Sequence, residues 1–266
     1  METVTNPLAV VTGASSGIGY ELARQFAAHG FDLITAAEDD ALASAAATLI
    51  TQGTRVEAIR TDLTTREGVE TLHRAVTATR RPVAAAALNA GIGQGGAFLE
   101  TDLADELEII DLNITSTVHL AKRLLPGMVE DGEGRMLITS SIASTMPGSF
   151  QPVYNASKSF LQSFAQALQN ELKDTGVTVT SLMPGPTETE FFERADMLDT
   201  KAGQADKDDP AQVAAQGFEA MMAGKDKVVA GSWKTKAQGL ANRVLPDSVK
   251  AQAHRGMAEP GSGAEG

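Results

Sequence analysis

The chain of 266 residues has no cysteine, which excludes disulfide bonds and thiolate metal sites. Histidine is scarce too: the four of them are scattered from His29 to His254, so the sequence predicts no metal site. Basic residues are outnumbered by acidic ones, 22 to 34, and the formal net charge is −12. Such a surface repels phosphate backbones and anionic lipids, so we expect neither nucleic acid nor a membrane as a partner.

Long apolar runs are absent as well. No stretch approaches the roughly 20 apolar residues that cross a bilayer, and the N-terminus lacks a basic segment followed by a long apolar run. Apolar residues make up 42% of the chain, which is enough for a sizeable core. We therefore expect a soluble cytoplasmic protein with a single folded domain, residues 1–258, and a flexible polar tail, residues 259–266.

Short apolar runs alternate with helical patterns along the chain. The runs that we interpret as strands are Leu8–Val11, Leu33–Ala36, Val56–Ile59, Val83–Leu88, Met136–Thr139, Val177–Leu182 and Val228–Ala230. The helical patterns are Ile18–Ala28, Asp40–Ile50, Asp105–Met128, Tyr154–Leu172, Ala211–Met222 and Lys236–His254. The acidic segment 188–209 fits neither pattern, and we interpret it as a substrate lid. The alternation predicts an α/β fold, a doubly wound parallel sheet with helices on both faces.

Three glycines stand between the first strand and the first helix, in the stretch 12–19, TGASSGIG. Glycines here permit a tight turn and let backbone N–H groups approach a pyrophosphate at the positive end of the helix, which indicates a dinucleotide site. The stretch 13–17, GASSG, also matches the G-x-S-x-G elbow of serine hydrolases. A hydrolase that uses Ser15 needs a histidine later in the chain, and only His254 is placed late, so this alternative is the weaker one.

Six motifs follow one another along the chain. They are TGASSGIG at 12–19, NAG at 89–91, DLN ending at Asn113, TSS ending at Ser141, YNASK at 154–158 and PGPTET at 184–189. This ordered set resembles the classical short-chain dehydrogenase/reductase family. The resemblance implies a Rossmann-type fold, a nicotinamide cofactor and the interconversion of alcohols and carbonyls. It also implies a homodimer or homotetramer assembled through the helices 105–128 and 154–172.

Tyr154 and Lys158 are four residues apart, so on a helix they share one face, about 6 Å apart along the axis. A phenol with a pKa near 10 exchanges protons poorly at neutral pH. A neighbouring ammonium favours the phenolate, so we expect Lys158 to lower the pKa of Tyr154 and make it the acid–base group. An isolated pair at this spacing is ordinarily helix surface, but the surrounding motifs favour catalysis. The resemblance implies that Lys158 also binds the nicotinamide ribose.

Ser141 precedes Tyr154 by thirteen residues, the separation that the family uses. The resemblance implies that the Ser141 hydroxyl binds the substrate oxygen, with Ser140 as local scaffolding. It further implies that Asn113 holds a water linking Lys158 to solvent. A satisfied buried amide is the competing interpretation of Asn113.

The remaining candidates follow strand ends, where a doubly wound sheet binds its ligand. By resemblance, the cofactor contacts are Gly13, Ser15, Ser16, Gly17, Ile18, Gly19, Glu38, Asp62, Leu63, Asn89, Ala90, Gly91, Tyr154, Lys158, Pro184, Gly185, Thr187 and Thr189. Asp62 matches the acid that contacts adenine in the family, although a simple helix cap is the competing interpretation. Thr187 stands where the family usually has valine.

The choice between NAD and NADP depends on charge near the adenine ribose. The phosphate of NADP requires a cation there, whereas a carboxylate favours the free hydroxyl of NAD. By resemblance, Ser16 and Glu38 stand where NADP users often place basic residues, and the stretch 38–40, EDD, is acidic. We predict NAD, with NADP as the alternative. The competing interpretation is that 38–40 only charges the start of a helix.

Two groups of apolar residues flank the catalytic motifs. They are Met146, Pro147 and Phe150 before Tyr154, and Phe191, Phe192 and Met197 in the lid segment. If both groups line the pocket, the substrate is a hydrophobic secondary alcohol or ketone. The alternative function is a non-catalytic NAD(P)-binding regulator of the same fold. The segment 225–255 holds seven basic and two acidic residues, and we interpret it as a solvated helix face or an intersubunit contact.

Overall fold

Seven parallel strands form one sheet in the computed structural model, which describes residues 6–50, 53–242 and 245–265. The strands are β1 (Leu8–Thr12), β2 (Asp32–Ala37), β3 (Val56–Arg60), β4 (Val83–Leu88), β5 (Gly134–Thr139), β6 (Val177–Pro184) and β7 (Lys227–Ala230). Their order in the sheet is β3-β2-β1-β4-β5-β6-β7, and each predicted strand is present. Strand order reverses between β1 and β4, so a crevice opens at their carboxyl ends.

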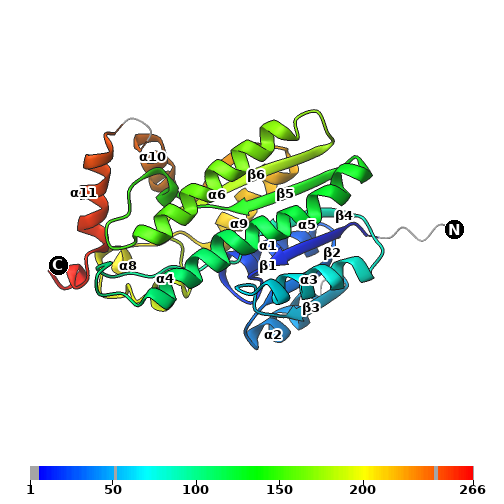
Figure 1. The fold of residues 1–266 in the computed structure, drawn as a ribbon, viewed down its shortest axis with the longest axis horizontal. Helices are drawn as coiled ribbons and strands as arrows, with labels where there is room; N and C mark the ends of the chain where they lie inside the picture. Colours follow the sequence, from blue (N-terminus) through cyan, green and yellow to red (C-terminus); the bar gives the residue numbers. More distant parts are fainter. Residues whose placement is uncertain (1–5, 51–52, 243–244, 266) are drawn as a thin grey trace.

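Helices cover both faces of the sheet (Figure 1). They are α1 (Gly17–Ala28), α2 (Ala41–Ile50), α3 (Arg66–Ala78), α4 (Leu103–Ile109), α5 (Ser116–Asp131), α6 (Pro152–Glu171), α7 (Phe191–Arg194), α8 (Lys201–Gln204), α9 (Pro210–Met222), α10 (Trp233–Ala241) and α11 (Asp247–Ala258). Successive residues of a strand pack into two cores, one on each face of the sheet. Val10 and Leu88 pack with α3, α5 and α6, whereas Val11 and Ala87 pack with α1, α2 and α9. The doubly wound fold is therefore confirmed.

Two helical predictions differ from the structure, and one helix was not predicted. The helix predicted over 105–128 is α4 and α5 joined by a π-helical segment, Ile110–Thr115. The helix predicted over 236–254 is divided into α10 and α11, because Pro246 cannot continue a helix and instead precedes the first turn of α11. Residues 243 and 244 of that prediction lie outside the described residues. Helix α3 has no counterpart in the prediction, although its N-cap, Thr65, accepts a hydrogen bond from Gly68.

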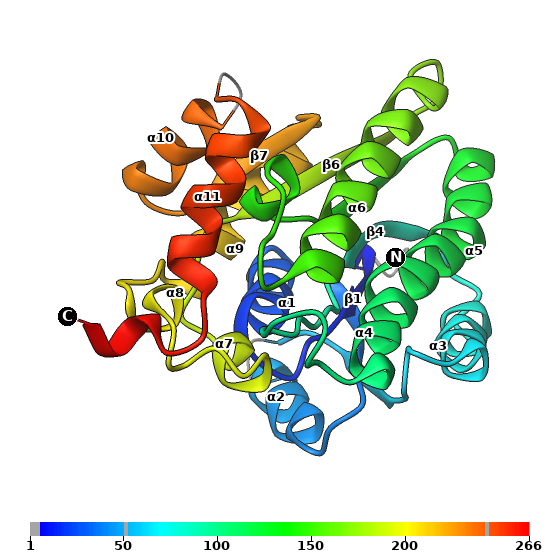
Figure 2. The same cartoon turned by 60° about the vertical axis from the view of Figure 1, so that its left-hand side comes forward.

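The C-terminal part of the chain returns to the lid segment (Figure 2). Helix α11 contacts α8, and residues 259–265, predicted as a flexible tail, continue from it as a turn and a 3-10 helix, Ser262–Glu265. Asp199 accepts backbone hydrogen bonds from Gly261 at 2.6 Å and Gly263 at 2.8 Å. Helix α11 and residues 259–265 therefore form a wall beside the lid segment.

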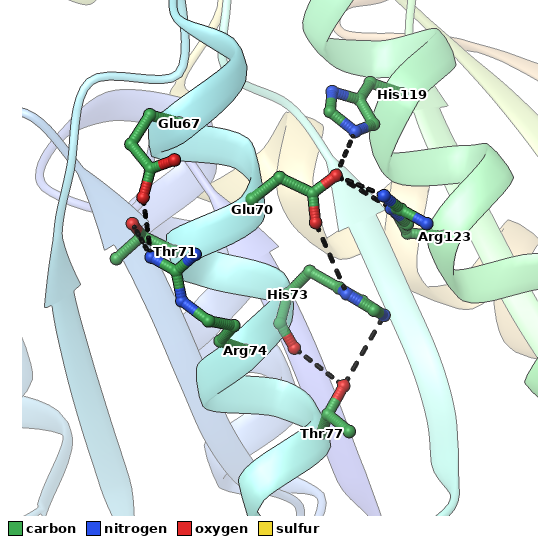
Figure 3. A network of polar contacts seen from close by, with 8 residues as sticks. All are labelled: Glu67, Glu70, Thr71, His73, Arg74, Thr77, His119 and Arg123. Carbon is green, nitrogen blue, oxygen red and sulfur yellow. Dashed lines mark hydrogen bonds and ion pairs between the residues drawn. The ribbon is translucent and has the colours of Figure 1, made fainter.

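A charged network joins α3 to α5 away from this crevice (Figure 3). The Glu70 carboxylate accepts hydrogen bonds from Arg123 and from His119 Nε2, the latter at 2.7 Å. Those two hydrogen bonds, that from Arg123 foremost, lower the pKa of Glu70 to about 2. The carboxylate therefore stays ionised at neutral pH and holds the two helices together.

Within the ranges that the structure describes, no helix combines the length and apolar character needed to cross a membrane. In the same ranges, no cluster of histidine and carboxylate side chains could hold a metal ion.

Candidate active site

A cavity of about 410 Å³ lies at the carboxyl ends of β1, β4, β5 and β6. It extends from the glycine turn after β1, past Tyr154, to the inner side of α11. The structure brings together around this cavity each site residue that the sequence predicts, except Asn113, which lies behind the loop after β4.

The glycine turn leads directly into α1. Gly13 adopts φ +66°, in the left-handed region that favours glycine, and Ser16 precedes α1 in an extended conformation. A Cβ on Gly19 would lie 2.0 Å from the carbonyl oxygen of Gly13, so no other residue fits there. The first turn of α1 carries no acidic side chain. This end of the cavity therefore fits a pyrophosphate.

Threonine hydroxyls hold the ends of three strands together. Thr12 Oγ1 accepts hydrogen bonds from the backbone N–H groups of Asn89 at 2.9 Å and Ala90 at 3.0 Å. Thr139 Oγ1 donates to Asn89 Oδ1 at 3.0 Å. The Asn89 side chain thus helps to position the backbone at the ends of these strands. Sequence reasoning missed the roles of Thr12 and Thr139. Each threonine ends its strand, which was the available signal.

Tyr154 and Lys158 lie on the first turns of α6, which begins at Pro152. Lys158 is 5% exposed, and its Nζ donates to the Thr139 carbonyl at 3.1 Å. The Nζ also lies 5.7 Å from the centre of the Tyr154 ring. Phe191 packs against that ring, with 5.1 Å between the ring centres. The phenol and the amine therefore share one compartment beneath the lid.

The pKa of Tyr154 shifts in the direction opposite to the one that the sequence predicts. Burial raises the pKa of Tyr154 to about 12, against the lowering effect of a hydrogen bond with Ser141. Burial also lowers the pKa of Lys158 to about 8. Lys158 is not among the causes of the Tyr154 shift, and its amine is directed to the Thr139 carbonyl and the face of the ring. At neutral pH the site therefore holds a protonated phenol, a proton donor.

The two serines after β5 serve different partners. Ser140 Oγ donates to the Lys158 carbonyl at 2.8 Å and so fixes β5 against α6. Ser141 lines the cavity, where its Oγ accepts from Ala143 N at 3.1 Å and donates to the Pro184 carbonyl at 3.4 Å. That last hydrogen bond is long, so the Ser141 hydroxyl can exchange it for a substrate oxygen.

Asn113 is fully buried in the π-helical segment, and the protein satisfies its amide. Its Oδ1 accepts from Ile92 N at 2.9 Å, and its Nδ2 donates to Ile92 O and to Ser157 Oγ, each at 2.9 Å. A Cβ on Gly91 would lie 2.9 Å from Asn113 Oδ1 and 3.1 Å from Lys158 Nζ. This geometry matches the satisfied buried amide, which fixes the loop after β4 beside Lys158.

Carboxylates surround the far end of the cavity, where β2 ends. Glu38 is exposed, whereas Asp39 is half-buried and accepts from Ser15 Oγ at 2.7 Å and from Ala41 N at 3.0 Å. Sequence reasoning did not single out Asp39, although it lies in the same acidic stretch. The nearby cation, Arg60, is occupied, because its guanidinium pairs with Asp40 and donates to the Glu38 carbonyl at 2.9 Å.

Asp62 lies at the same end of the cavity and is exposed. Its Oδ1 accepts from Thr64 N at 2.8 Å and from Thr64 Oγ1 at 2.7 Å, which closes a local turn. Thr65, and not Asp62, is the N-cap of α3. The second carboxylate oxygen of Asp62 remains available to a ligand.

The Ser15 hydroxyl does not have the partner that a hydrolase needs. It donates to Asp39, and His254 Nδ1 donates to the Ser149 carbonyl at 2.9 Å. Among the residues that the structure describes, no histidine hydrogen-bonds Ser15. The geometry therefore disfavours a serine nucleophile at this turn.

Hydrogen bonds hold the loop after β6 in place beside the segment 188–209. Thr187 Oγ1 donates to the Gly185 carbonyl at 2.9 Å, and Thr187 pairs as a parallel bridge with Asp208. Asp208 is buried and accepts from Thr235 Oγ1 at 2.6 Å and from Ser232 N at 2.9 Å. This network holds residues 184–189 against the cavity.

The substrate end of the cavity has an apolar lining. Its apolar side chains include Met146, Phe191, Phe192, Met197 and Met257. Pro147 and Phe150 do not line it; the Phe150 ring instead packs against the Arg255 guanidinium, 5.1 Å away. Helix α11 adds Lys250 and His254, which sequence reasoning assigned to a solvated helix face or an intersubunit contact. The break at Pro246 and the packing of α11 against α8 bring these residues to the cavity.

Comparison with known proteins gives a consistent result. A sequence model of the short chain dehydrogenase family matches residues 7–199. The chain is 33% identical over 186 residues to sulfoacetaldehyde reductase 2 of Chromohalobacter salexigens, which covers 69% of this chain and 74% of the relative.

Two solved structures share the fold. A short chain dehydrogenase/reductase from Burkholderia phymatum in complex with NAD has a TM-score of 0.83 at 25% identity, covering 95% of this chain and 97% of that one. A short-chain dehydrogenase from Sphingobium yanoikuyae in complex with NADPH has a TM-score of 0.78 at 28% identity, covering 84% and 87%.

Proposed function

We propose, since the chain belongs to the short-chain dehydrogenase family, that it reduces apolar ketones to secondary alcohols with Tyr154 as the proton donor. As a member of this family it is an NAD(P)-dependent oxidoreductase. The observation that carries the proposal is the phenol of Tyr154, which shares the cavity with Ser141 and Lys158 and, with a pKa of about 12, is protonated at neutral pH.

The residues around the cavity fit a dinucleotide from end to end. The turn at Gly13 and Gly19 leaves backbone exposed to a pyrophosphate, and Lys158 would bind the nicotinamide ribose. The loop with Thr187 and Thr189 would bind the carboxamide. When bound, the nicotinamide supplies a hydride to the carbonyl carbon of the substrate.

The chain's own residues move the proton. Ser141 would orient the substrate oxygen, and Tyr154 would transfer its phenolic proton to that oxygen. The Lys158 ammonium would stabilise the phenolate that remains. Phe191 and Met197 of the lid segment would exclude water from the reacting atoms.

Turnover with medium-chain ketones and NADH tests this function. We expect ketone-dependent loss of absorbance at 340 nm that is constant near neutral pH and decreases above about pH 8. The reason is that Lys158 loses its charge as the pH rises through about 8, whereas Tyr154, with a pKa of about 12, stays protonated. Lys158 is charged below that pH and neutral above it. The rate is therefore expected to fall, and not to rise, as the pH increases.

Saturating concentrations of ketone and NADH at each pH separate the catalytic step from binding. A rate that increases from pH 7 to 10 would contradict the role of Lys158. Tight NADH binding without turnover of any ketone would instead support a non-catalytic dinucleotide-binding protein.

We propose NAD as the preferred cofactor, because Glu38 and Asp39 present negative charge where a ribose phosphate would lie. The double variant Glu38→Arg, Asp39→Ser supplies a cation and keeps a residue that can cap α2. We expect wild type to bind NAD about 10-fold more tightly than NADP, and the variant to reverse this preference. Calorimetry measures both affinities.

The control is Glu130→Arg, which repeats the Glu-to-Arg part of that change on an exposed residue of α5 outside the cavity. It should leave the NAD to NADP ratio unchanged. A wild-type preference for NADP would overturn the assignment of Glu38 and Asp39.

We also propose a homodimer or homotetramer that uses α4 and α6. These helices expose large apolar side chains: Leu103, Leu107 and Phe160, with relative exposures of 68%, 48% and 41%. Light scattering at micromolar concentration tests this, and a monomer would contradict it.

A further inference from the structure

Asp208 is a buried carboxylate at the end of the segment 188–209, and it does not line the cavity. Its side chain is directed to the first turn of α10 and to the residue before that helix. Oδ1 accepts a hydrogen bond from Ser232 N at 2.9 Å, and Oδ2 accepts one from Thr235 Oγ1 at 2.6 Å. Both carboxylate oxygens are therefore used within the protein.

The backbone of Asp208 holds the loop after β6, residues 185–189. Its N–H donates to the Pro186 carbonyl at 2.8 Å, and its carbonyl accepts from Glu188 N at 2.9 Å. These two hydrogen bonds flank Thr187, which lines the cavity. The position of Asp208 therefore fixes the loop on both sides of Thr187.

The same loop packs against α10 at Gly185. A Cβ on Gly185 would lie 2.5 Å from Thr235 Cγ2, so the loop backbone is in direct contact with the residue that binds the Asp208 carboxylate. Gly231 adopts φ +131°, and a Cβ there would lie 2.0 Å from Asp208 Oδ2. Glycine at these two positions therefore lets the carboxylate, the threonine and the loop pack together.

Gln216 on α9 holds the other side of this cluster. Its Oε1 accepts from Gly231 N at 3.1 Å, and its Nε2 donates to the Gly231 carbonyl at 3.3 Å. Helix α9 itself packs in the core that it shares with α1 and α2. Asp208 thus joins the loop to the packed core of the fold.

We propose that Asp208 is a positioning residue for the cofactor, because it holds the loop 185–189 where that loop would bind the nicotinamide carboxamide. Neither Asp208 nor Thr235 lines the cavity, so their effect passes through the loop backbone. The inference rests on the proposed contact of Thr187 and Thr189 with the carboxamide. A misplacement of about 1 Å at a reacting centre costs on the order of 10²-fold in rate, so the support behind the loop affects both binding and hydride transfer.

Two ligands that differ only in the nicotinamide ring localise the effect. ADP-ribose has the adenine, both riboses and the pyrophosphate of NAD⁺ and lacks the ring. The variant Asp208→Ala removes both side-chain acceptors and keeps the backbone hydrogen bonds to the loop. We expect the ratio of dissociation constants, NAD⁺ over ADP-ribose, to increase about 10-fold in this variant, because the loop is no longer preorganised for the ring. Calorimetry measures both constants.

Two milder variants test the same cluster. Thr235→Val keeps the volume of the side chain and removes one hydrogen bond to Asp208, so it should increase the ratio about threefold. Asp208→Asn keeps an acceptor for Ser232 N and a polar partner for Thr235 Oγ1, so its ratio should stay within about twofold of wild type. If Asp208→Ala does not fold, these two variants decide the question.

The matched control is Asp209→Ala, the same substitution at the neighbouring residue. Asp209 is exposed and outside the cavity, and it caps α9 by accepting a hydrogen bond from Ala211 N at 2.9 Å. Loss of this cap should lower the Tm by about 2–4 °C and leave the ratio of dissociation constants unchanged.

An unchanged ratio in Asp208→Ala and Thr235→Val, or equal weakening of both ligands, would overturn the inference and leave the proposed function intact. The calorimetric ratio needs no turnover. If no ketone is reduced but the ratio increases as expected, the proposed function fails and positioning by Asp208 stands. If ketones are reduced, kcat at saturating NADH should also decrease about 10-fold in Asp208→Ala and stay at the wild-type value in Asp209→Ala.

Discussion

Tyr154→Phe should fold, bind NADH and lose about 1,000-fold in kcat for ketone reduction. The substitution removes one oxygen atom and keeps the ring that packs against Phe191 at 5.1 Å. The proton that Tyr154 would donate then has to come from water, and a positioned general acid typically contributes about 10²- to 10⁴-fold. Stopped-flow or steady-state loss of NADH absorbance measures the effect.

The chain offers a matched control, because its other tyrosine is Tyr20 on α1. Tyr20 packs partly against the second core and does not line the cavity. Tyr20→Phe should retain kcat within about twofold, and both variants should bind NADH as wild type does. A Tyr154→Phe enzyme with more than a tenth of wild-type turnover would refute the acid–base role.

Lys158→Met should have the second-largest effect, a decrease of about 100-fold in kcat/KM together with weaker NADH binding. The ammonium is the cation that would stabilise the Tyr154 phenolate, and it is held by the Thr139 carbonyl at 3.1 Å. The variant should also lose the decrease in rate above about pH 8, because the group that titrates there is gone. A pH series of kcat on both enzymes tests this point.

Stability should change in the opposite direction. The ordinary pKa of 10.5 falls to about 8 in the folded chain, so keeping Lys158 charged below pH 8 costs about 3 kcal/mol, a penalty that fades between pH 8 and 10.5. Methionine removes that penalty, so Lys158→Met should melt at a higher temperature at pH 7. The control Lys173→Met changes an exposed lysine on the surface. A lower Tm together with the activity loss would indicate simple unfolding.

Local sequence patterns were sufficient to predict much of the fold and of the candidate site. The apolar runs, the glycine turn and the four-residue spacing of Tyr154 and Lys158 depend only on neighbours along the chain. Strand–helix alternation then restricts the topology, because parallel strands require right-handed crossovers. The doubly wound sheet, and the gathering of strand-end residues around one crevice, follow from that restriction.

Other features depend on contacts between distant parts of the chain. The predicted helix 236–254 ran through Pro246, and the packing of α11 against α8, which brings His254 and Lys250 to the cavity, has no signal in the sequence. Asn113 is satisfied by Ile92, which lies 21 residues away, and no periodicity predicts that pairing. Sequence patterns place the elements but not the surfaces that they present to one another.

The sequence alone therefore determined the order of the strands along the chain, the position of the glycine turn and the presence of a phenol and an amine on one helix face. Tertiary structure alone decided the proton affinity of that phenol and the shape of the substrate wall. The physical reason is desolvation: the pKa of Tyr154 rises to about 12 because burial disfavours the charged phenolate, and burial is a property of the whole fold.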